Sequence, residues 1–185
     1  MAWVIDQSHS QVQFSVKHMM ISTVRGQFKS FTGTVEADEA NPTAAQVDVQ
    51  IDASSILTGD ERRDGHLRSP DFFNVEQYPY ITFKSTRVER LDENTGKLIG
   101  NLTIRDVTKE VVLDLEYAGQ AKSPWGNTSA GFSATTKINR KDWDLNWNVA
   151  LETGGWLVSD QITINIEVEL VKQVPAEQNE AVVAA

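Results

Sequence analysis

Apolar and polar residues alternate along most of the chain with a period of two. Between residues 11 and 17, for example, Val12, Phe14 and Val16 are separated by polar residues. Successive side chains of a β-strand point to opposite faces, so each such segment has one apolar and one solvated face. This pattern is typical of antiparallel sheets that pack on one side. Clear alternation occurs near residues 12–16, 47–51, 98–104, 111–117, 132–138 and 162–170.

Two further segments, Val24 to Ala37 and Tyr80 to Val88, alternate less regularly and bring the expected number of strands to about eight. Eight strands suffice for a closed barrel that either fills its interior or holds one small ligand. Turn residues at 92–96 and 123–127 separate strands and offer Asn and Gly for positive φ. We therefore predict an all-β fold, a single antiparallel eight-stranded barrel with meander connections.

The segment from Asp60 to Ser69 departs from this alternation. Thr58 or Asp60 can cap its start, acidic residues lie in its first turn, and Pro70 follows its end. We predict a short helix here, although Gly65 weakens it. We expect this helix to cover one end of the barrel through nearby apolar residues, namely Leu67, Phe72 and Phe73.

The alternation stops near residue 172, and the residues that follow are polar or small. We expect residues 1–172 to form one barrel domain and residues 173–185 to form a disordered tail. No stretch approaches the roughly 20 apolar residues that span a bilayer. The first residues lack a basic region followed by an apolar run, which predicts a cytoplasmic protein, or a periplasmic one if a leader has been removed.

Composition narrows the classes of partner. The 185 residues include 26 acidic and 17 basic residues, for a formal net charge of −9 and a pI near 4.8. An acidic surface repels phosphate backbones and anionic membranes, so we expect neither a nucleic-acid partner nor stable membrane insertion. The chain has no cysteine, which excludes thiolate chemistry and cysteine-ligated metals.

The candidates for catalysis and metal binding are few. The spacing of the three histidines, His9, His18 and His66, matches no short metal-binding motif, and we predict no metal and no cofactor. Ser10, His9 and Asp6 form no convincing relay, because neighbours on one strand point to opposite faces and no Gly-x-Ser-x-Gly elbow is present. We predict no catalytic residue.

Two features remain open to a binding interpretation. His18 continues the alternation of Val12, Phe14 and Val16, so we expect its side chain to point into the barrel. There it is either a hydrogen-bonded core histidine or a polar group that meets a ligand head group. Arg62, Arg63, His66 and Arg68 form a basic cluster in an acidic chain. These residues either solvate a helix face and pair with nearby carboxylates, or form a site for a polar head group at the barrel mouth.

Four tryptophans, Trp125, Trp143, Trp147 and Trp156, lie in the late loops and strand ends. Tryptophan combines a large apolar surface with one hydrogen-bond donor, so it suits both a core and a wet rim. These residues either pack in the core or at the rim, or line the entrance for a ligand.

A series of short motifs follows in a fixed order along the chain. The motifs are Trp3-Val4-Ile5-Asp6 with His9-Ser10, Phe14-Ser15-Val16-Lys17-His18-Met19, Gly26-Gln27-Phe28, the block Arg63 to Phe73, Tyr78-Pro79, Ile81 to Ser85, Leu102-Thr103-Ile104 with Val107-Thr108-Lys109, Gly131-Phe132, and Ile138 to Asp142. In this order they resemble the YceI-like family, also described as polyisoprenoid-binding, lipocalin-like proteins, and the resemblance extends from Trp3 to about Val171. Asp106 and Asp144 stand where the family usually has glycine, and Asp tolerates a left-handed backbone better than most residues.

The resemblance implies a lipocalin-like barrel whose internal channel binds an isoprenoid chain, a prenyl quinone or a related long-chain lipid. Such a protein sequesters or transports lipid and is not an enzyme. Parity and the resemblance together single out the expected ligand-binding residues. They are Val12, Phe14, Val16, His18, Phe28, Val49, Ile51, Arg63, His66, Ile81, Phe83, Leu102, Leu113, Phe132, Trp143 and Ile164.

Two other functions fit the same alternation. A barrel filled by its own side chains would serve as a stress-related scaffold or interaction protein, because hollow and filled barrels show the same period. A lipid-modifying enzyme would need an acid–base role for His18 or His66. A homodimer is compatible with the chain, since twofold dimers are the commonest assemblies.

Overall fold

The computed structural model describes residues 1–174, and the predicted tail lies outside the described residues from residue 175 onward. One α-helix, α1 (Glu61–Arg68), and three short 3-10 helices, η1 (Gln7–His9), η2 (Ala53–Ser55) and η3 (Arg140–Trp143), accompany the strands. The strands are β1 (Ala2–Ile5), β2 (Gln11–His18), β3 (Ser22–Phe28), β4 (Phe31–Asp38), β5 (Asn41–Asp52), β6 (Ile56–Leu57), β7 (Tyr80–Arg90), β8 (Thr95–Ile104), β9 (Val107–Lys122), β10 (Thr128–Asn139) and β11 (Val158–Lys172).

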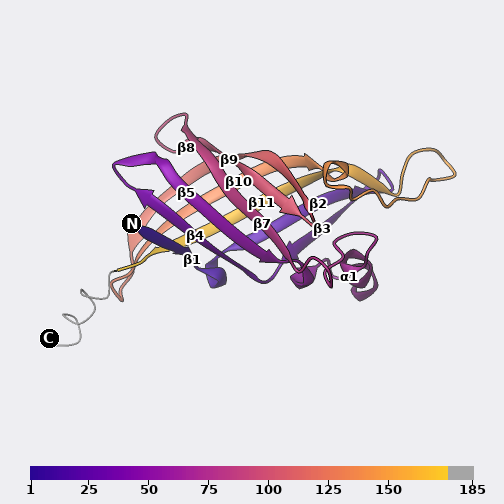
Figure 1. Ribbon diagram of the computed structural model, residues 1–185, viewed down its shortest axis with the longest axis horizontal. Coiled ribbons are helices and arrows are strands. Elements are labelled where there is room, and N and C mark those ends of the chain that lie inside the picture. Colours follow the sequence, from indigo (N-terminus) through magenta and orange to yellow (C-terminus); the bar gives the residue numbers. More distant parts are fainter. Residues whose placement is uncertain (175–185) are drawn as a thin grey trace.

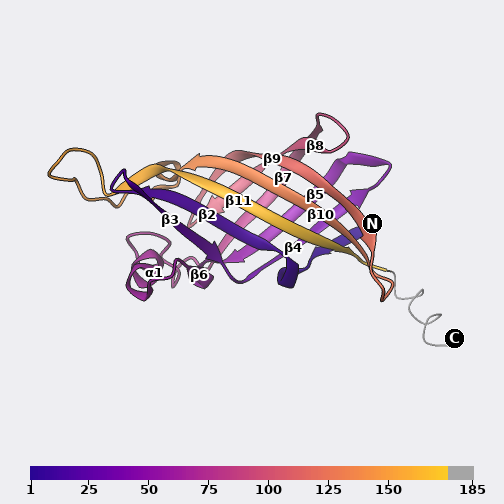
Figure 2. The ribbon, with the colours of Figure 1, turned by 180° about the vertical axis from the view of Figure 1, so that it is seen from behind.

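The strands form a closed antiparallel barrel, which confirms the predicted fold. Strands β1, β4, β5, β7, β8, β9, β10 and β11 pair in this order, and β11 returns to β1, with Trp3 opposite Lys172. Figures 1 and 2 show an elongated barrel with the N-terminus at one end and α1 at the other. We call these the N-terminal end and the α1 end.

Two aspartates interrupt strands near the middle of the barrel. The Asp6 carboxylate accepts a hydrogen bond from the Ser8 amide at 2.9 Å and begins η1. The Asp52 carboxylate accepts one from the Ser54 amide at 3.0 Å and begins η2. Each break divides one long strand into two parts, because an Asp-x-Ser sequence offers the backbone a local turn in place of a ladder bond.

The strand segments beyond these breaks extend the sheet at the α1 end. Strand β2 pairs with β11, β3 pairs with β2, and β6 pairs with β3. Within residues 1–174, β6 makes no ladder with β7. The segment 58–79, which contains α1, connects β6 to β7 at this place, as Figure 1 shows.

The helix α1 lies where the sequence predicts it, and Asp60 is its N-cap. The Asp60 carboxylate accepts a hydrogen bond from the Arg63 amide at 3.0 Å. Polar contacts also fix the helix, since the buried Asp64 carboxylate accepts hydrogen bonds from the Thr58 amide and hydroxyl. The predicted apolar contacts also form, because Leu67, Phe72 and Phe73 are buried or partly buried, Leu67 and Phe73 against the main core.

The turn between β7 and β8 differs from its prediction. Neither Asn94 nor Gly96 has a positive φ. Instead, the Asp92 carboxylate accepts hydrogen bonds from the amides of Asn94 and Thr95, both at 2.8 Å. Gly96 is required for a different reason, because a Cβ there would overlap the carbonyl oxygen of Glu89.

Other turns agree with the conformations that their residues favour. Gly126, between β9 and β10, has a φ of 93°. Asp144 adopts the left-handed conformation after η3, with a φ of 58°. The two-residue turn between β8 and β9 is an exception, because its positive φ falls on Arg105, at 55°, and not on Asp106, although few residues other than glycine adopt this conformation. Of the two aspartates, only Asp144 needs the left-handed backbone that Asp tolerates better than most residues.

None of the helices within residues 1–174 combines the length and the apolar character needed to cross a bilayer.

Candidate functional site: a long apolar cavity

A cavity of about 970 Å³ runs inside the barrel. It lies at the upper end of the roughly 300–1,000 Å³ typical of small-molecule sites. Its wall includes residues near both ends, such as Glu39 and Asn94 at the N-terminal end and His18 and Trp147 at the α1 end. The interior is therefore not filled by side chains, contrary to what the scaffold alternative requires.

The middle of the cavity wall is mostly apolar because most inward-facing positions of the long strands are aliphatic or aromatic. Several of these side chains are only partly buried although they point inward, since they face empty space. Fifteen of the sixteen predicted ligand-binding residues lie in the wall, whereas their contact with a ligand stays a prediction. The fifteen are Val12, Phe14, Val16, His18, Phe28, Val49, Ile51, Arg63, His66, Ile81, Phe83, Leu102, Leu113, Phe132 and Ile164.

Trp143, the remaining expected ligand-binding residue, takes the core position that was its other alternative and lies outside the wall. It lies in η3, is 2% exposed, and does not line the cavity. Its indole Nε1 donates a hydrogen bond to the carbonyl oxygen of Leu102 at 2.9 Å. The residue packs in the core behind the wall, and the other late tryptophan Trp147 takes the wall position instead.

Glycines shape the wall by leaving room for large rings. Gly26 of β3 lies opposite Phe14 of β2 in the ladder. A Cβ at Gly26 would overlap the Phe14 ring, so the ring lies over the glycine. Phe14 then contacts Phe28, whose ring centroid is 5.7 Å away. The aromatic ring is held against the barrel wall and the channel beside it stays open.

The α1 end of the cavity carries the basic cluster and its aromatic support. The His66 ring packs edge-on against Trp147 at 4.5 Å and Phe72 at 5.1 Å, measured between ring centroids. Its Nε2 lies 2.8 Å from the Asp71 carboxylate. These contacts hold the His66 side chain in a fixed position at the α1 end of the cavity wall.

The arginines at this end differ from each other in their contacts. The Arg63 guanidinium donates hydrogen bonds to the Thr58 hydroxyl and carbonyl oxygens, both at 2.7 Å. Within residues 1–174 the Arg62 side chain makes no hydrogen bond or ion pair, and it lines the cavity. Of the two, Arg62 has the guanidinium available to a ligand. Arg68, by contrast, donates to backbone carbonyls of Ser54 and Ile56, so it fixes the helix.

The charges in the cavity wall are separated by end, and sequence inspection missed this. Among residues 1–174, the wall's carboxylates all lie at the N-terminal end, where Arg90 is the only basic wall residue. The other basic wall residues, Lys17, Arg62, Arg63 and Arg140, lie at the α1 end, with His18 and His66. The carboxylates are Asp38, Glu39, Glu89, Asp92 and Glu93.

A buried arginine closes the wall beside Trp147, and sequence inspection also missed it. Arg140 is 3% exposed. Its Nη1 donates hydrogen bonds to the carbonyl oxygens of Leu145 at 2.6 Å and Trp147 at 2.9 Å, and its Nε donates to that of Ser159 at 3.1 Å. The pKa of the guanidinium is lowered overall, because burial lowers it more than the nearby Asp160 carboxylate raises it. The side chain fixes residues 145–147 to the start of β11.

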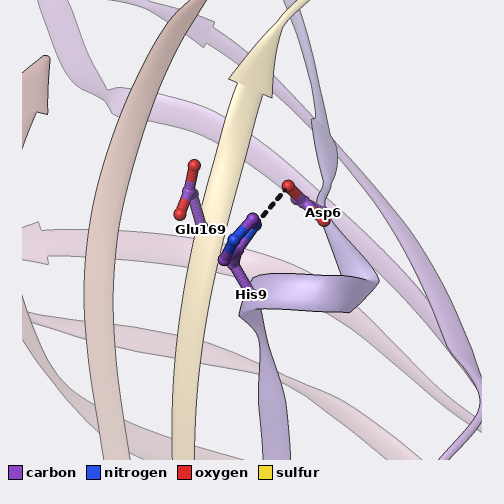
Figure 3. A group of neighbouring side chains, drawn as sticks. All are labelled: Asp6, His9 and Glu169. Carbon is purple, nitrogen blue, oxygen red and sulfur yellow. Dashed lines mark hydrogen bonds and ion pairs between the residues drawn. The ribbon is translucent and has the colours of Figure 1, made fainter. Parts of the chain in front are cut away.

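Outside the cavity, Asp6, His9 and Glu169 lie together on the surface (Figure 3), with potential ligand atoms within 4.8 Å of one another. Hydrogen bonds from Ser8 and then from His9 hold the pKa of Asp6 down at about 2. The pKa of His9 lies above its ordinary value of 6.5. The hydrogen bond to Asp6 raises it most, and the negative charges of Asp6 and Glu169 raise it further. Only the fold brings Glu169 to His9, so sequence spacing gave no sign of this group.

The same geometry argues against a nucleophilic relay. His9 Nδ1 is the atom near both the Asp6 carboxylate, at 2.8 Å, and the Ser8 hydroxyl, at 3.2 Å. A relay needs two different ring nitrogens for these two partners. Ser10 is buried, and its hydroxyl accepts a hydrogen bond from the Glu169 amide at 3.0 Å.

Comparison with known proteins places this barrel among relatives. A family model for the YceI-like domain matches residues 3–170. Protein YceI of Salmonella newport is 40% identical over 165 residues, which cover 89% of this chain and 83% of that protein. The solved YCEI protein of Campylobacter jejuni is similar with a TM-score of 0.74 and 37% identity, over 85% of this chain and 90% of that one. A polyisoprenoid binding domain from Saccharophagus degradans shares the fold, with a TM-score of 0.65 and 15% identity over 94% of this chain and 98% of that one.

Proposed function

The chain belongs to the YceI-like family, and we propose that it binds one long-chain apolar lipid in its barrel and sequesters or transports it. The observation that carries this proposal is the apolar cavity of about 970 Å³ along the barrel. Its elongated form suits a flexible hydrocarbon chain such as a polyisoprenoid, a prenyl quinone or a fatty-acyl derivative. The shared fold with a polyisoprenoid binding domain supports the same class of ligand.

The driving force for binding is the removal of hydrocarbon from water. Each buried methylene contributes about 0.8 kcal/mol before the cost of ordering the chain. Along the middle of the wall described for residues 1–174, the side chains are uncharged and mostly apolar, and the Thr136 hydroxyl already donates a hydrogen bond to the Val112 carbonyl oxygen at 2.8 Å. Burial of a hydrocarbon there therefore costs little in lost hydrogen bonds. Affinity should therefore rise with chain length until the chain reaches the charged rims.

The separation of charge by end favours one orientation of the ligand. A polar or anionic head group would lie at the α1 end, near Arg62 and Arg63, with His18 beside it. The carboxylates of the N-terminal end would repel an anionic head group. The hydrocarbon tail would then extend from the α1 end toward the N-terminal end.

Binding without catalysis fits the histidines better than an enzymatic role does. His66 is held by Asp71 and two aromatic rings. His18 is half-buried in an apolar wall, and within residues 1–174 its ring makes no hydrogen bond that would orient it for proton transfer. The enzyme alternative predicts turnover that is lost in His18→Gln while lipid binding persists.

A matched pair of substitutions on β10 tests the proposal. Ala134 lines the cavity, whereas its neighbour Thr135 is exposed on the outer face. We expect Ala134→Trp to reduce the binding of a fluorescent polyene fatty acid, and Thr135→Trp to bind like the wild type. The readout is the stoichiometry and affinity in a fluorescence titration, with circular dichroism to show that the β-structure is retained.

A second cavity-filling variant protects the test against a folding failure. Phe14→Trp enlarges a ring that already lies in the wall, and it should also reduce uptake. Unchanged stoichiometry and affinity in both folded cavity variants would overturn the proposal of an internal lipid site.

A further inference from the structure

Two exposed apolar segments lie at the α1 end of the barrel. The turn between β2 and β3 carries Met19, Met20 and Ile21, and Ile21 is 83% exposed. The segment between η3 and β11 carries Val149 and Trp156, and Trp156 is 54% exposed. We call these five residues the apolar tip. In Figure 1 the second segment is the orange loop that extends beyond the barrel on the side of α1.

The apolar tip is an ordered structure. Residues 149–157 form a small hairpin in which the Leu157 amide donates to the Val149 carbonyl oxygen at 2.9 Å. The Leu151 amide donates to the Gly155 carbonyl oxygen at 3.0 Å and closes the turn. The Met19 amide donates to the Leu157 carbonyl oxygen at 2.8 Å and joins the two segments. Met20 also lies against Gly155, because a Cβ at Gly155 would overlap the Met20 sulfur, so the two segments are in contact.

The apolar tip adjoins the α1 end of the cavity. His18 directly precedes the first segment, and Leu157 and Val158 directly follow the exposed part of the second. These three residues line the cavity. A molecule that covers the apolar tip therefore lies next to this end of the cavity.

Few charges lie within the two segments that carry the apolar tip. Residues 145–157 contain one charged residue, Glu152, and residues 19–21 contain none, in a chain with 23% charged residues. The cavity-lining carboxylates all lie at the opposite end. Exposed Met, Ile and Trp side chains with few charges are favoured where a protein surface meets the boundary between head groups and acyl chains.

We propose that the apolar tip docks on the surface of a lipid bilayer and holds the cavity mouth against it. The lipid ligand then passes between bilayer and cavity without crossing water. Docking is peripheral, because the tip consists of side chains on a turn and a short hairpin. The inference rests on the proposed lipid-binding function, and it adds the surface from which the ligand is taken.

The opposite end of the barrel supplies a matched control. Trp125 is 87% exposed in the turn between β9 and β10, and Leu91 is exposed in the turn between β7 and β8. The double variant Ile21→Glu/Trp156→Glu changes one aliphatic and one aromatic residue of the apolar tip. The double variant Leu91→Glu/Trp125→Glu makes the same kind of change far from the cavity mouth at the α1 end.

The experiment measures flotation with phosphatidylcholine vesicles and the rate at which a fluorescent polyene fatty acid moves from protein to vesicles. We expect the tip variant to partition about tenfold less than the wild type, and to transfer its ligand more slowly. The control variant should partition and transfer like the wild type. Equal partitioning of all three proteins, or no partitioning of the wild type, would overturn the inference.

Two further readouts separate the remaining outcomes. Sedimentation without vesicles shows whether a second copy covers the tip, and a wild-type dimer that the tip substitutions dissociate would overturn membrane docking. Titration of the fatty acid without vesicles tests the proposed function alone. If the fatty acid binds normally in solution but the tip substitutions change neither flotation nor transfer, only the docking proposal is refuted. If the fatty acid does not bind in solution, the lipid-binding function itself is refuted.

Discussion

Replacement of the buried Arg140 by methionine should strongly destabilise the α1 end of the barrel. The guanidinium donates to three backbone carbonyl oxygens, those of Leu145, Trp147 and Ser159. Methionine has a similar length but no donor, so these carbonyl groups lose their charged partner. Each unsatisfied buried group costs about 1–3 kcal/mol, and loss of one member of a buried charged network costs about 3–5 kcal/mol. We expect Arg140→Met to lower the free energy of unfolding by about 3–5 kcal/mol.

Urea unfolding followed by circular dichroism measures this change, with the midpoint and slope determined for each variant. Lys141→Met is the matched control, because Lys141 is the next residue, is exposed and pairs with Asp160 at 3.4 Å. Such an exposed pair is worth at most about 1 kcal/mol. A loss below about 1 kcal/mol for Arg140→Met would refute the view that this arginine holds residues 145–147 to β11.

Three more predictions concern the wall and the surface group. Trp143→Phe should lower the free energy of unfolding by about 1–3 kcal/mol in urea, because the Leu102 carbonyl loses its hydrogen-bond donor. Lipid uptake should stay unchanged, and reduced uptake would show that Trp143 contributes to the ligand site. Gly26→Val should force the Phe14 ring into the channel, so a fluorescence titration should show weaker uptake, and normal uptake would contradict the account of the wall. Asp6→Asn should be less stable than the wild type at neutral pH, and this difference should shrink as pH falls from about 4 toward 2, because the folded-state pKa of Asp6 is about 2 against an ordinary 3.8. A difference independent of pH in that range would contradict the pairing of Asp6 with Ser8 and His9.

The period-two pattern carried most of the prediction because it reports directly on which side chains face inward. Successive side chains of a strand point to opposite faces, so the apolar residues that alternate with polar ones share the inner face. Val12, Phe14 and Val16 accordingly line the cavity. The same rule placed His18 in the wall. Parity describes only the direction of a side chain, however, so it could not distinguish a filled interior from an open one.

The failures occur where no strand parity exists or where the fold joins distant segments. Trp143 lies in a 3-10 helix, where a period of two says nothing about direction. The Asp92 carboxylate, and not a glycine, supplies the turn between β7 and β8. His9 meets Glu169 only because β11 passes beside η1. Such contacts depend on ladder register and barrel closure, which local sequence does not determine.

Native mass spectrometry of the protein purified without detergent, followed by organic extraction, shows whether the barrel is hollow and holds one long-chain lipid. A hollow barrel should carry the mass of one lipid per chain, identified after extraction, or should take up one prenyl quinone or fatty amide per chain on incubation. A mass equal to that of the bare chain, unchanged after incubation with both classes of lipid, would show that the barrel holds no such lipid.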